Sequence, residues 1–286
     1  MSSALSSFAA EWLKLRKRPA VWVLGAILVA LASVFQYGVI ALLVAVSSRN
    51  ASLSSGVTLE DLRQSLYPRH WTQMTIATIS TSSVGPPIAI ILGVLAYGSE
   101  YGWATMKTVF TQRPGRLATL AGKLGALAVV LALYVVAVFA SSAALSAALG
   151  AAYGALTPWP SALDIGKTVL SGWLILGLWA AYGILLSVLF RQSALAIGLG
   201  LIYAIVLEGL VLGLGAQFSW VKTALPWFPG WNASSLVRSF GSAVRASSSV
   251  AGTPIVGRTQ AVLVVAAFMA AFVVVAAALL RRRDIS

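Results

Sequence analysis

Long apolar segments alternate with shorter polar ones along the 286 residues of the chain. Each apolar segment is long enough to cross the hydrocarbon core of a bilayer as a helix, which takes about 20 residues. We therefore predict six transmembrane helices, at about residues 20–46, 76–97, 118–149, 166–190, 193–214 and 258–280. These spans take up most of the chain, so the sequence predicts an all-α polytopic membrane protein with a single transmembrane domain over residues 1–286.

An amphipathic helix is predicted over residues 3–18, ahead of the first span. Apolar and charged side chains fall on opposite sides at helical spacing: Leu5, Phe8, Ala9, Trp12 and Leu13 against Glu11, Lys14, Lys17 and Arg18. A helix of this kind lies in the headgroup layer with its aromatic face toward the hydrocarbon. The alternative is a flexible start to the first span.

Caps and prolines modify this pattern in two places. Thr58 and Asp61 have the spacing of a helix cap, which predicts a short helix over Thr58–Arg69 after the first span. Pro86 and Pro87 fall near the middle of the second span, where they remove backbone donors and bend a helix. That bend is either a hinge or a static kink.

The composition agrees with a membrane protein, since 59% of the residues are hydrophobic, 9% are charged and the mean hydropathy is +0.90. Soluble domains carry about 25% charged residues. The net charge is +13, but the bases stand at the ends of apolar segments, which is typical of contacts with lipid headgroups and argues against nucleic acid. The chain has no cysteine and one histidine, His70, so no metal site is predicted.

The distribution of bases predicts the orientation. Six spans place both termini on one side, together with the segment Tyr97–Lys123 and the tight turn at Arg191-Gln192. The segments on that side hold 12 of the 20 bases, although the opposite segments are longer in total. The positive-inside rule therefore predicts that both termini are cytoplasmic. The aromatic-rich loop Gly215–Gly257 is then on the outer side.

Enzymatic chemistry is not predicted from the residues. Gly166-Lys167-Thr168 resembles the end of a phosphate-binding loop, but the glycine that the pattern needs five positions earlier is missing. The adjacent acids Glu60 and Asp61 do not face each other on a helix, so they are no catalytic pair. We therefore expect no catalytic residues and no nucleotide bound by this chain.

Glu208 is an acid inside the fifth predicted span. A carboxylate at that depth is costly and faces a cavity or a partner. Gly209 and Gly213 follow it in a pattern of small residues that favours close helix contact. We predict that these residues line a translocation path or a contact with a second subunit. The alternatives are that Glu208 makes a structural hydrogen bond to another span, or that burial keeps its carboxyl group neutral.

Aromatic residues crowd the outer loop, among them Trp227, Phe228 and Trp231. They form an aromatic belt at the interface, short helices that dip into the outer leaflet, or both.

The most specific motif lies in the polar segment Tyr97–Lys123. Its spaced residues are Glu100, Thr105, Lys107, Pro114, Arg116 and Lys123. By themselves they make a charged elbow that can dock on a soluble partner, or an ordinary loop with snorkelling bases. Taken with the six spans, the N-terminal helix and the long loop before the last span, the motif resembles that of the permease subunits of type-2 ABC exporters. This chain has Ala104 where that family often has glycine.

This resemblance implies the membrane half of an ATP-driven exporter in the bacterial plasma membrane. The chain would pair with a second copy of itself and with two separate ABC ATPase subunits. Those subunits would bind ATP and magnesium, and this chain would bind no cofactor. The resemblance also implies that the first and fifth spans face the second copy. It further implies that the outer aromatic loop forms an exit gate.

The same resemblance assigns roles to two short helices. Leu5–Arg18 would be the connecting helix, and Glu100–Phe110 would be the coupling helix seated on the ATPase. The coupling contacts would be Glu100, Tyr101, Thr105, Lys107 and Phe110.

The sequence is compatible with more than one cargo and more than one energy source. The apolar spans suggest a lipophilic or amphipathic cargo such as a drug, a peptide antibiotic or a lipid-like molecule. The main alternative is a stand-alone proton-coupled transporter that uses Glu208 as its proton site. An intramembrane enzyme is a third class, and the chain lacks the residues for it.

Overall fold

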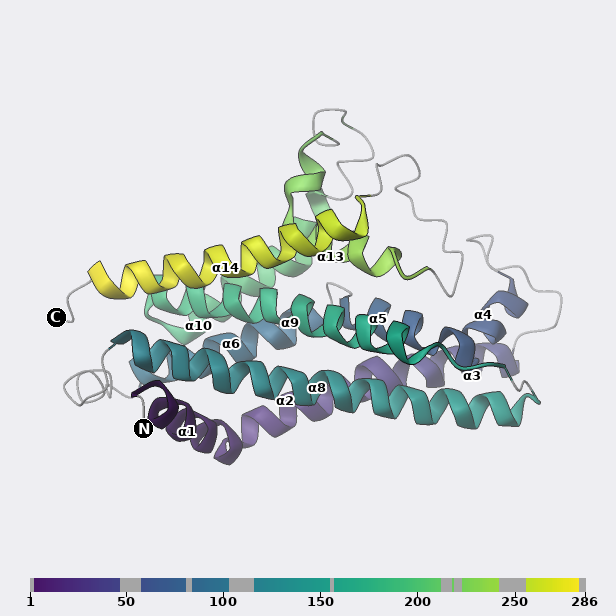
Figure 1. Cartoon of the computed structure of the whole chain (residues 1–286). Helices are drawn as coiled ribbons and strands as arrows, with labels where there is room; N and C mark the ends of the chain where they lie inside the picture. Colours follow the sequence, from purple (N-terminus) through teal and green to yellow (C-terminus); the bar gives the residue numbers. More distant parts are fainter. Residues whose placement is uncertain are drawn as a thin grey trace.

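The computed structural model describes residues 3–46, 58–80, 84–102, 116–154, 157–211, 218, 223–241 and 256–282. Within these residues all regular elements are helices, most of them arranged roughly side by side in a bundle (Figure 1). The elements of the first half are α1 Ser3–Lys17, α2 Pro19–Val29, η1 Ala30–Phe35, α3 Gln36–Val46, α4 Leu59–Ser65, η2 Pro68–His70, α5 Trp71–Ser80 and α6 Gly85–Gly102. Those of the second half are α8 Arg116–Ala152, α9 Ala162–Phe190, α10 Ser193–Leu201, η3 Ile202–Leu207, η4 Leu225–Trp227, α13 Pro229–Arg238 and α14 Arg258–Arg282.

Five helices in the described residues are long and apolar enough to cross a membrane. They are Pro19–Val46, Leu117–Ala152, Ala162–Phe190, Ser193–Val211 and Arg258–Arg282. A sixth crossing is formed if the bent pair Pro68–Ser80 and Gly85–Gly98 counts as one span. The helical class and the multi-pass character predicted from the sequence are thus confirmed.

The second predicted span is a bent pair of helices instead of one helix. Its two parts meet at 55°. The sequence predicted that Pro86 and Pro87, near the middle of this span, bend a helix. In the structure the span is bent, and the two prolines occupy the first turn of α6, after the break. A first turn tolerates proline because its backbone N–H groups have no partner within the helix. The prolines therefore begin a new helix.

Two local predictions agree with the structure. Thr58 caps α4 in a reciprocal box: its Oγ1 accepts from the Asp61 N–H at 3.1 Å, and the Asp61 carboxylate accepts from the Thr58 N–H at 3.1 Å. Arg191 ends α9 with a left-handed backbone, φ 54°, and α10 begins two residues later. This conformation makes the tight turn that the sequence predicted between the fourth and fifth spans.

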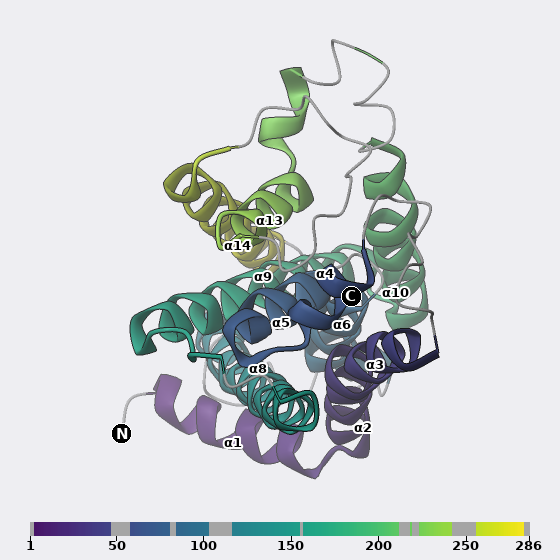
Figure 2. The ribbon, with the colours of Figure 1, turned by 90° about the vertical axis from the view of Figure 1, so that its right-hand side faces the viewer.

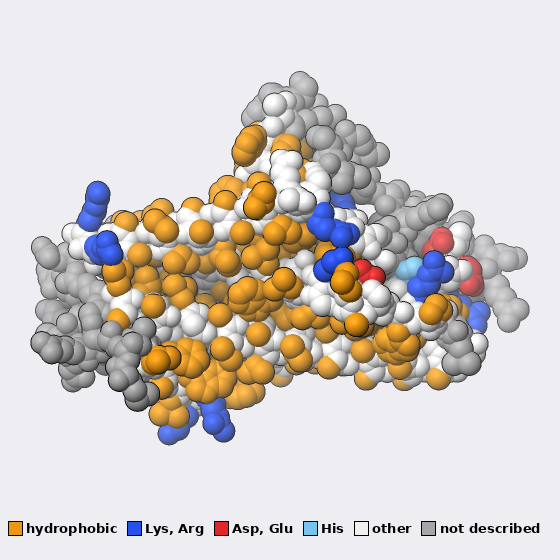
Figure 3. All heavy atoms as spheres, in the orientation of Figure 1, with side chains coloured by type: hydrophobic (Ala, Val, Ile, Leu, Met, Phe, Trp, Pro, Cys, Tyr) orange, Lys and Arg blue, Asp and Glu red, His pale blue; other side chains and the backbone are white. Residues whose placement is uncertain are grey.

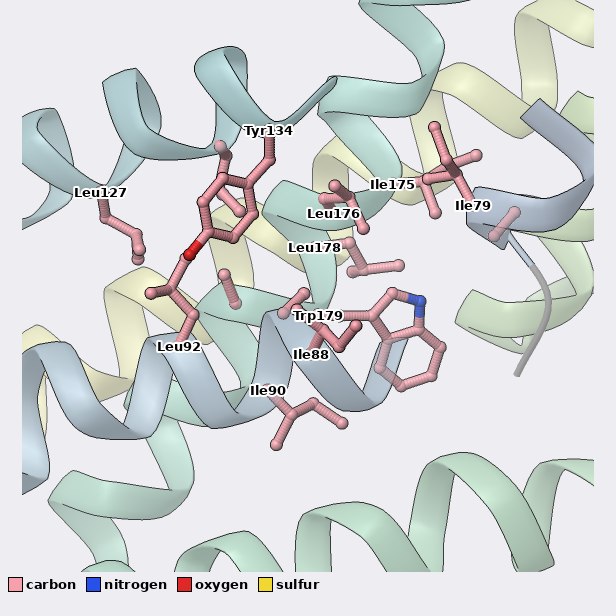
Figure 4. Close-up of a cluster of buried hydrophobic side chains, with 14 of the residues drawn as sticks. Ile79, Ile88, Ile90, Leu92, Leu127, Tyr134, Ile175, Leu176, Leu178 and Trp179 are labelled. Carbon is pink, nitrogen blue, oxygen red and sulfur yellow. The ribbon is translucent and has the colours of Figure 1, made fainter. Parts of the chain in front are cut away.

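Helices α6 and α9 form the centre of the bundle and touch through their backbones. A Cβ atom on Gly93 would lie 2.1 Å from the carbonyl oxygen of Ala180, and one on Gly183 would lie 2.4 Å from that of Ile90. Glycine is therefore required at both positions, because small residues let membrane helices approach closely. Around this contact, buried side chains of α6, α8 and α9 interdigitate, and Figure 4 labels Ile88, Ile90, Leu92, Leu127, Tyr134, Leu176 and Trp179 among them.

The two ends of the bundle differ. The start of α1, the end of α6, the start of α8 and the end of α14 lie together at one end, which we call the termini end (Figure 1). Helix α4 lies at the opposite end, and α9 and α14 begin on the side of the bundle that is turned toward it; we call this the far end. Figure 3 shows charged side chains gathered at both ends and a hydrophobic band between them. This distribution is the one expected for a bundle that spans a bilayer.

The first and fifth spans are largely exposed on one side of the bundle. In the most apolar stretch of each, 22% of the residues are buried, against 61% in α9. Figure 2 shows α2, α3 and α10 on that side, with α14, also largely exposed, on the other. Each of these two spans contains a π-helical segment, η1 or η3.

Gly183→Ala is expected to destabilise the bundle, because the added methyl group has no room against the α6 backbone. Overpacking typically costs about 1–3 kcal/mol, so the thermal unfolding midpoint of the purified protein in detergent should fall. Gly166→Ala is the matched control on the same helix, where a Cβ atom would meet nothing within 4 Å. Equal midpoints for the two variants would contradict the close contact of α6 with α9.

Candidate functional site

A buried ion pair joins three helices at the termini end. Lys123, near the start of α8, is 2% exposed, and Glu11 of α1 is 5% exposed. The Lys123 Nζ donates to Glu11 Oε2 at 2.8 Å and to the carbonyl oxygen of Ala96 in α6 at 3.4 Å. It also lies 5.7 Å from the centre of the Tyr97 ring. One ammonium group therefore binds α1, α6 and α8 together, and we call this site the junction.

A second base reinforces the junction from the end of α1. The Arg18 Nη1 donates to the carbonyl oxygen of Leu95 at 2.7 Å. Arg18 and Lys123 thus contact two consecutive carbonyl groups of α6, about two turns before that helix ends at Gly102. The part of α6 that leads into residues 103–115 is held from two sides.

Small residues let α1 lie directly on α8. Ser7, Glu11 and Leu15, spaced four residues apart, are all buried. A Cβ atom on Gly122 would be 2.7 Å from the backbone carbonyl carbon of Ser7, so the two helices touch at this glycine. Side chains four residues apart share one face of a helix, and here that face is turned toward the protein.

This packing corrects the predicted orientation of Glu11. The helical spacing in the sequence predicted that Glu11 lies on the polar side of α1 with Lys14, Lys17 and Arg18. In the structure Glu11 is buried against α8, and Lys14, 42% exposed, reaches back to Glu11 Oε1 at 2.7 Å. The helical period alone could not show this, because the charge that pairs with Glu11 lies 112 residues away.

Two other residues named for this helix, Phe8 and Trp12, are half-buried and pack against the core. Leu5 and Leu13 are exposed, at 57% and 51%. Helix α1 therefore presents apolar surface outward while its acid faces inward. An outward apolar face suits a helix at the membrane interface.

Burial and neighbouring charges act in opposite directions on Glu11. Burial raises the pKa of its carboxyl group, but the ammonium group of Lys123, followed by that of Lys14, lowers it more, so the pKa lies below its ordinary value of 4.5. The carboxylate is consequently ionised at neutral pH, and the ion pair is intact.

The residues assigned to coupling lie at or beyond the end of α6. Glu100 and Tyr101 belong to the last turn of this helix, whose backbone continues to Gly102. Thr105, Lys107 and Phe110 lie outside the described residues. The junction is thus directly connected to the segment that carries the family motif.

Glu208 directly follows η3 and packs against the first turn of α13. Its carboxylate accepts a hydrogen bond from the backbone N–H of Gly230, and a Cβ atom there would be 2.0 Å from Glu208 Oε2. Phe228, Trp231 and Val211 line a small void together with Glu208. The structure thus brings together an acid and two aromatic residues that the sequence singled out separately.

The other residues predicted for this region lie apart from Glu208. Trp227 is 69% exposed. Gly209 is also exposed, and a Cβ atom there would meet nothing within 4 Å, so no helix of the described residues packs on it. Gly213 lies outside the described residues.

Several residues of these sites were not found from the sequence. Tyr182 of α9 and Tyr203 of η3 pack close to Glu208, with ring centroids 5.2 Å apart and the ring planes tilted by 49°. Gly122 and Gly230 could not be singled out from the sequence, because each matters only through the close approach of another segment, at Ser7 and at Glu208. Within the described residues no three His, Cys, Asp or Glu side chains are grouped as metal ligands.

Lys123→Met is expected to release α1 from the bundle, because Glu11 would stay buried without its main partner. Breaking a buried pair in this way typically costs about 3–5 kcal/mol. Hydrogen exchange of the Ser3–Lys17 backbone should then be faster. The control is Lys14→Met, since a pair with an exposed lysine contributes at most about 1 kcal/mol. Equally fast exchange in both variants would contradict the role of Lys123.

The same contact should depend on pH. Because the pKa of Glu11 is lowered in the folded protein, its ionised form stabilises the docking of α1 above the ordinary value of 4.5. That stabilisation is lost as the pH falls through the lowered value. Protection factors of α1 should therefore be steady near neutral pH and fall below about pH 4.5. Glu11→Gln should abolish this fall, and its persistence would assign the pH dependence to another group.

A family model described as "ABC-2 family transporter protein" matches residues 7–207, more than two thirds of the chain. The matched region begins within α1, includes the whole junction and ends at the last residue of η3. A search of curated proteins finds no match to the chain. The chain therefore belongs to the ABC-2 family of membrane transporter proteins.

Proposed function

We propose that this chain is the permease subunit of an ATP-driven exporter. It would form a dimer with a second copy and bind two copies of a separate ABC ATPase, which hydrolyses ATP. Membership of the ABC-2 family supports this function. The observation that carries the coupling mechanism is the junction, where Lys123 and Arg18 hold the end of α6 to α1 and α8.

The junction gives a physical route from the ATPase to the spans. A displacement of residues 100–110 by the ATPase would act on the end of α6. Because α6 is joined there to α1 and α8, and along its length to α9, these helices would move as one body. ATP would drive export through unequal affinity of the ATPase for the inward- and outward-open states.

The exposed apolar side of the bundle supports a contact with a second copy through the first and fifth spans. Large hydrophobic side chains are exposed on both, for example Trp22 and Phe35 on the first and Ile202 and Leu210 on the fifth. No atom of the described residues would lie within 4 Å of a Cβ atom on Gly209, so a helix of the second copy would be able to pack closely there. Helix α14, exposed on the opposite side, would face lipid.

We propose that the termini end faces the cytoplasm of a bacterial cell. The excess of bases in the segments of that end supports this orientation. Trp227, Phe228 and Trp231 would then belong to the outer part of the protein and contribute to an exit gate. Glu208, bound to the start of α13, would transmit movement of the fifth span to that gate. The cargo class we propose is lipophilic or amphipathic.

Glu100→Lys is expected to abolish ATP-dependent transport without preventing insertion. The measurement is efflux of a lipophilic fluorescent dye from proteoliposomes that hold the chain and its partner ATPase. Efflux by the variant should fall close to the level without ATP, because the reversed charge lies where the ATPase would dock. Glu60→Lys is the control, the same charge reversal in α4 at the far end.

Two results would contradict this function. Undiminished efflux by Glu100→Lys, with the ATPase bound normally, would remove the coupling role from that segment. Efflux driven by a pH gradient in the absence of the ATPase, and lost in Glu208→Gln, would instead establish the proton-coupled alternative.

A further inference from the structure

A polar cavity of about 290 Å³ opens at the far end of the bundle. Segments distant in sequence surround it: η2 and α5, the start of α9, the residues after α13, and the start of α14. The side chains that line it are Arg69, Thr72, Gln73, Pro160, Asp164, Thr168, Phe240 and Arg258. Figure 3 shows basic and acidic side chains gathered at this end, next to the hydrophobic band. None of these residues belongs to the junction or to the Glu208 site.

The wall of the cavity is held in place by hydrogen bonds. The Arg258 Nε donates to Ser239 Oγ at 3.0 Å, and its guanidinium group lies 4.6 Å from the centre of the Phe240 ring. From α5, the Gln73 Nε2 donates to the Phe240 carbonyl oxygen at 2.9 Å. The short segment after α13 is thereby fixed to both α5 and α14. A ligand would meet a preformed site and would lose little free energy in ordering it.

Two arginines and one aspartate line this cavity. Arg69 is exposed, and within the described residues its guanidinium group has no hydrogen bond or ion pair with the protein, whereas its backbone N–H donates to Thr157 Oγ1. The Asp164 Oδ2 accepts from Ser161 Oγ at 2.7 Å, and no ion pair joins Asp164 to either arginine. The lining therefore carries an excess of positive charge, with one arginine available to a ligand.

The position of the cavity along the bundle points to the kind of anion. Asp164 and Arg258 stand in the first turns of two membrane-spanning helices, α9 and α14. The first turns of such helices lie at the level of the lipid headgroups. A guanidinium group is the side chain best suited to phosphate, because its planar donors match two phosphate oxygens. The bilayer itself presents phosphate groups at this height.

We propose that this cavity binds the phosphate group of a phospholipid in the leaflet at the far end. Arg69 would contact the phosphate directly, and Arg258 would add charge while keeping the wall in place. Asp164 would weaken binding of a purely anionic headgroup through repulsion. This proposal goes beyond the exporter function and does not depend on the ATPase.

Binding to the purified full-length chain in detergent tests the proposal. The probes are a short-chain phosphatidylglycerol below its micelle concentration, a diacylglycerol of the same chain length that lacks phosphate, and inorganic phosphate. Saturable binding of phosphatidylglycerol is expected, with far weaker binding of the other two. Arg69→Gln should weaken it about tenfold, since hydrogen bonds to charged groups are among the stronger ones. Lys167→Gln, which removes a base at the same end outside the cavity lining, should leave it unchanged.

Asp164→Asn should change the affinity for phosphatidylglycerol in the opposite direction from Arg69→Gln. It removes the acid but keeps an oxygen that can accept from Ser161, so α9 should start as before. Phosphatidylglycerol should bind several-fold more tightly to this variant because a like charge is gone. A merely structural role of the cavity would not produce opposite effects for Arg69 and Asp164.

Three results would overturn the proposal. Equal binding to the wild type and Arg69→Gln would remove the arginine from the site. Equal binding of diacylglycerol and phosphatidylglycerol would show that phosphate is not recognised. Inorganic phosphate bound as tightly as phosphatidylglycerol would assign the site to a soluble anion. All three are measured without transport, so they are separate from any failure of the exporter function.

Discussion

The burial of one ammonium group organises the termini end of this protein. Lys123 is shielded from water, and a buried base is tolerated only when a carboxylate and further acceptors surround it. Glu11 supplies the carboxylate and the α6 backbone supplies a carbonyl oxygen. An N-terminal helix that could lie loosely in the headgroup layer is consequently tied to the spans. The end of α6 is fixed at the point where the chain enters the segment with the family motif.

The junction can transmit a movement to the spans because α6 is also packed rigidly against α9. The contact of α6 with α9 through Gly93 and Gly183 leaves no space for the two helices to slide independently. At the other end of the fifth span, the Glu208 carboxylate is bound to the start of α13. The junction and the contact of Glu208 thus both join short peripheral helices to the long ones. Such attachments are strong and specific because competing water is scarce around them.

The sequence alone determined the features that depend on local composition. Lengths of apolar segments determined the helical class and the approximate positions of the spans. Local hydrogen-bond chemistry determined the cap at Thr58, and the two polar residues after the fourth span determined the turn at Arg191. The spaced motif in Tyr97–Lys123 indicated the family. Each of these signals lies within a few turns of chain, so no knowledge of partners was needed.

Only the tertiary structure decided which faces meet. It turned Glu11 inward, placed Pro86 after the bend instead of within it, and gave Glu208 a partner in α13. It also assembled the cavity that contains Arg69 and Arg258 from segments almost 190 residues apart. The reason is that hydropathy defines how far a helix extends but not how it is rotated about its axis. In a bundle that rotation is determined by steric fit between helices and by the few charges that must find partners.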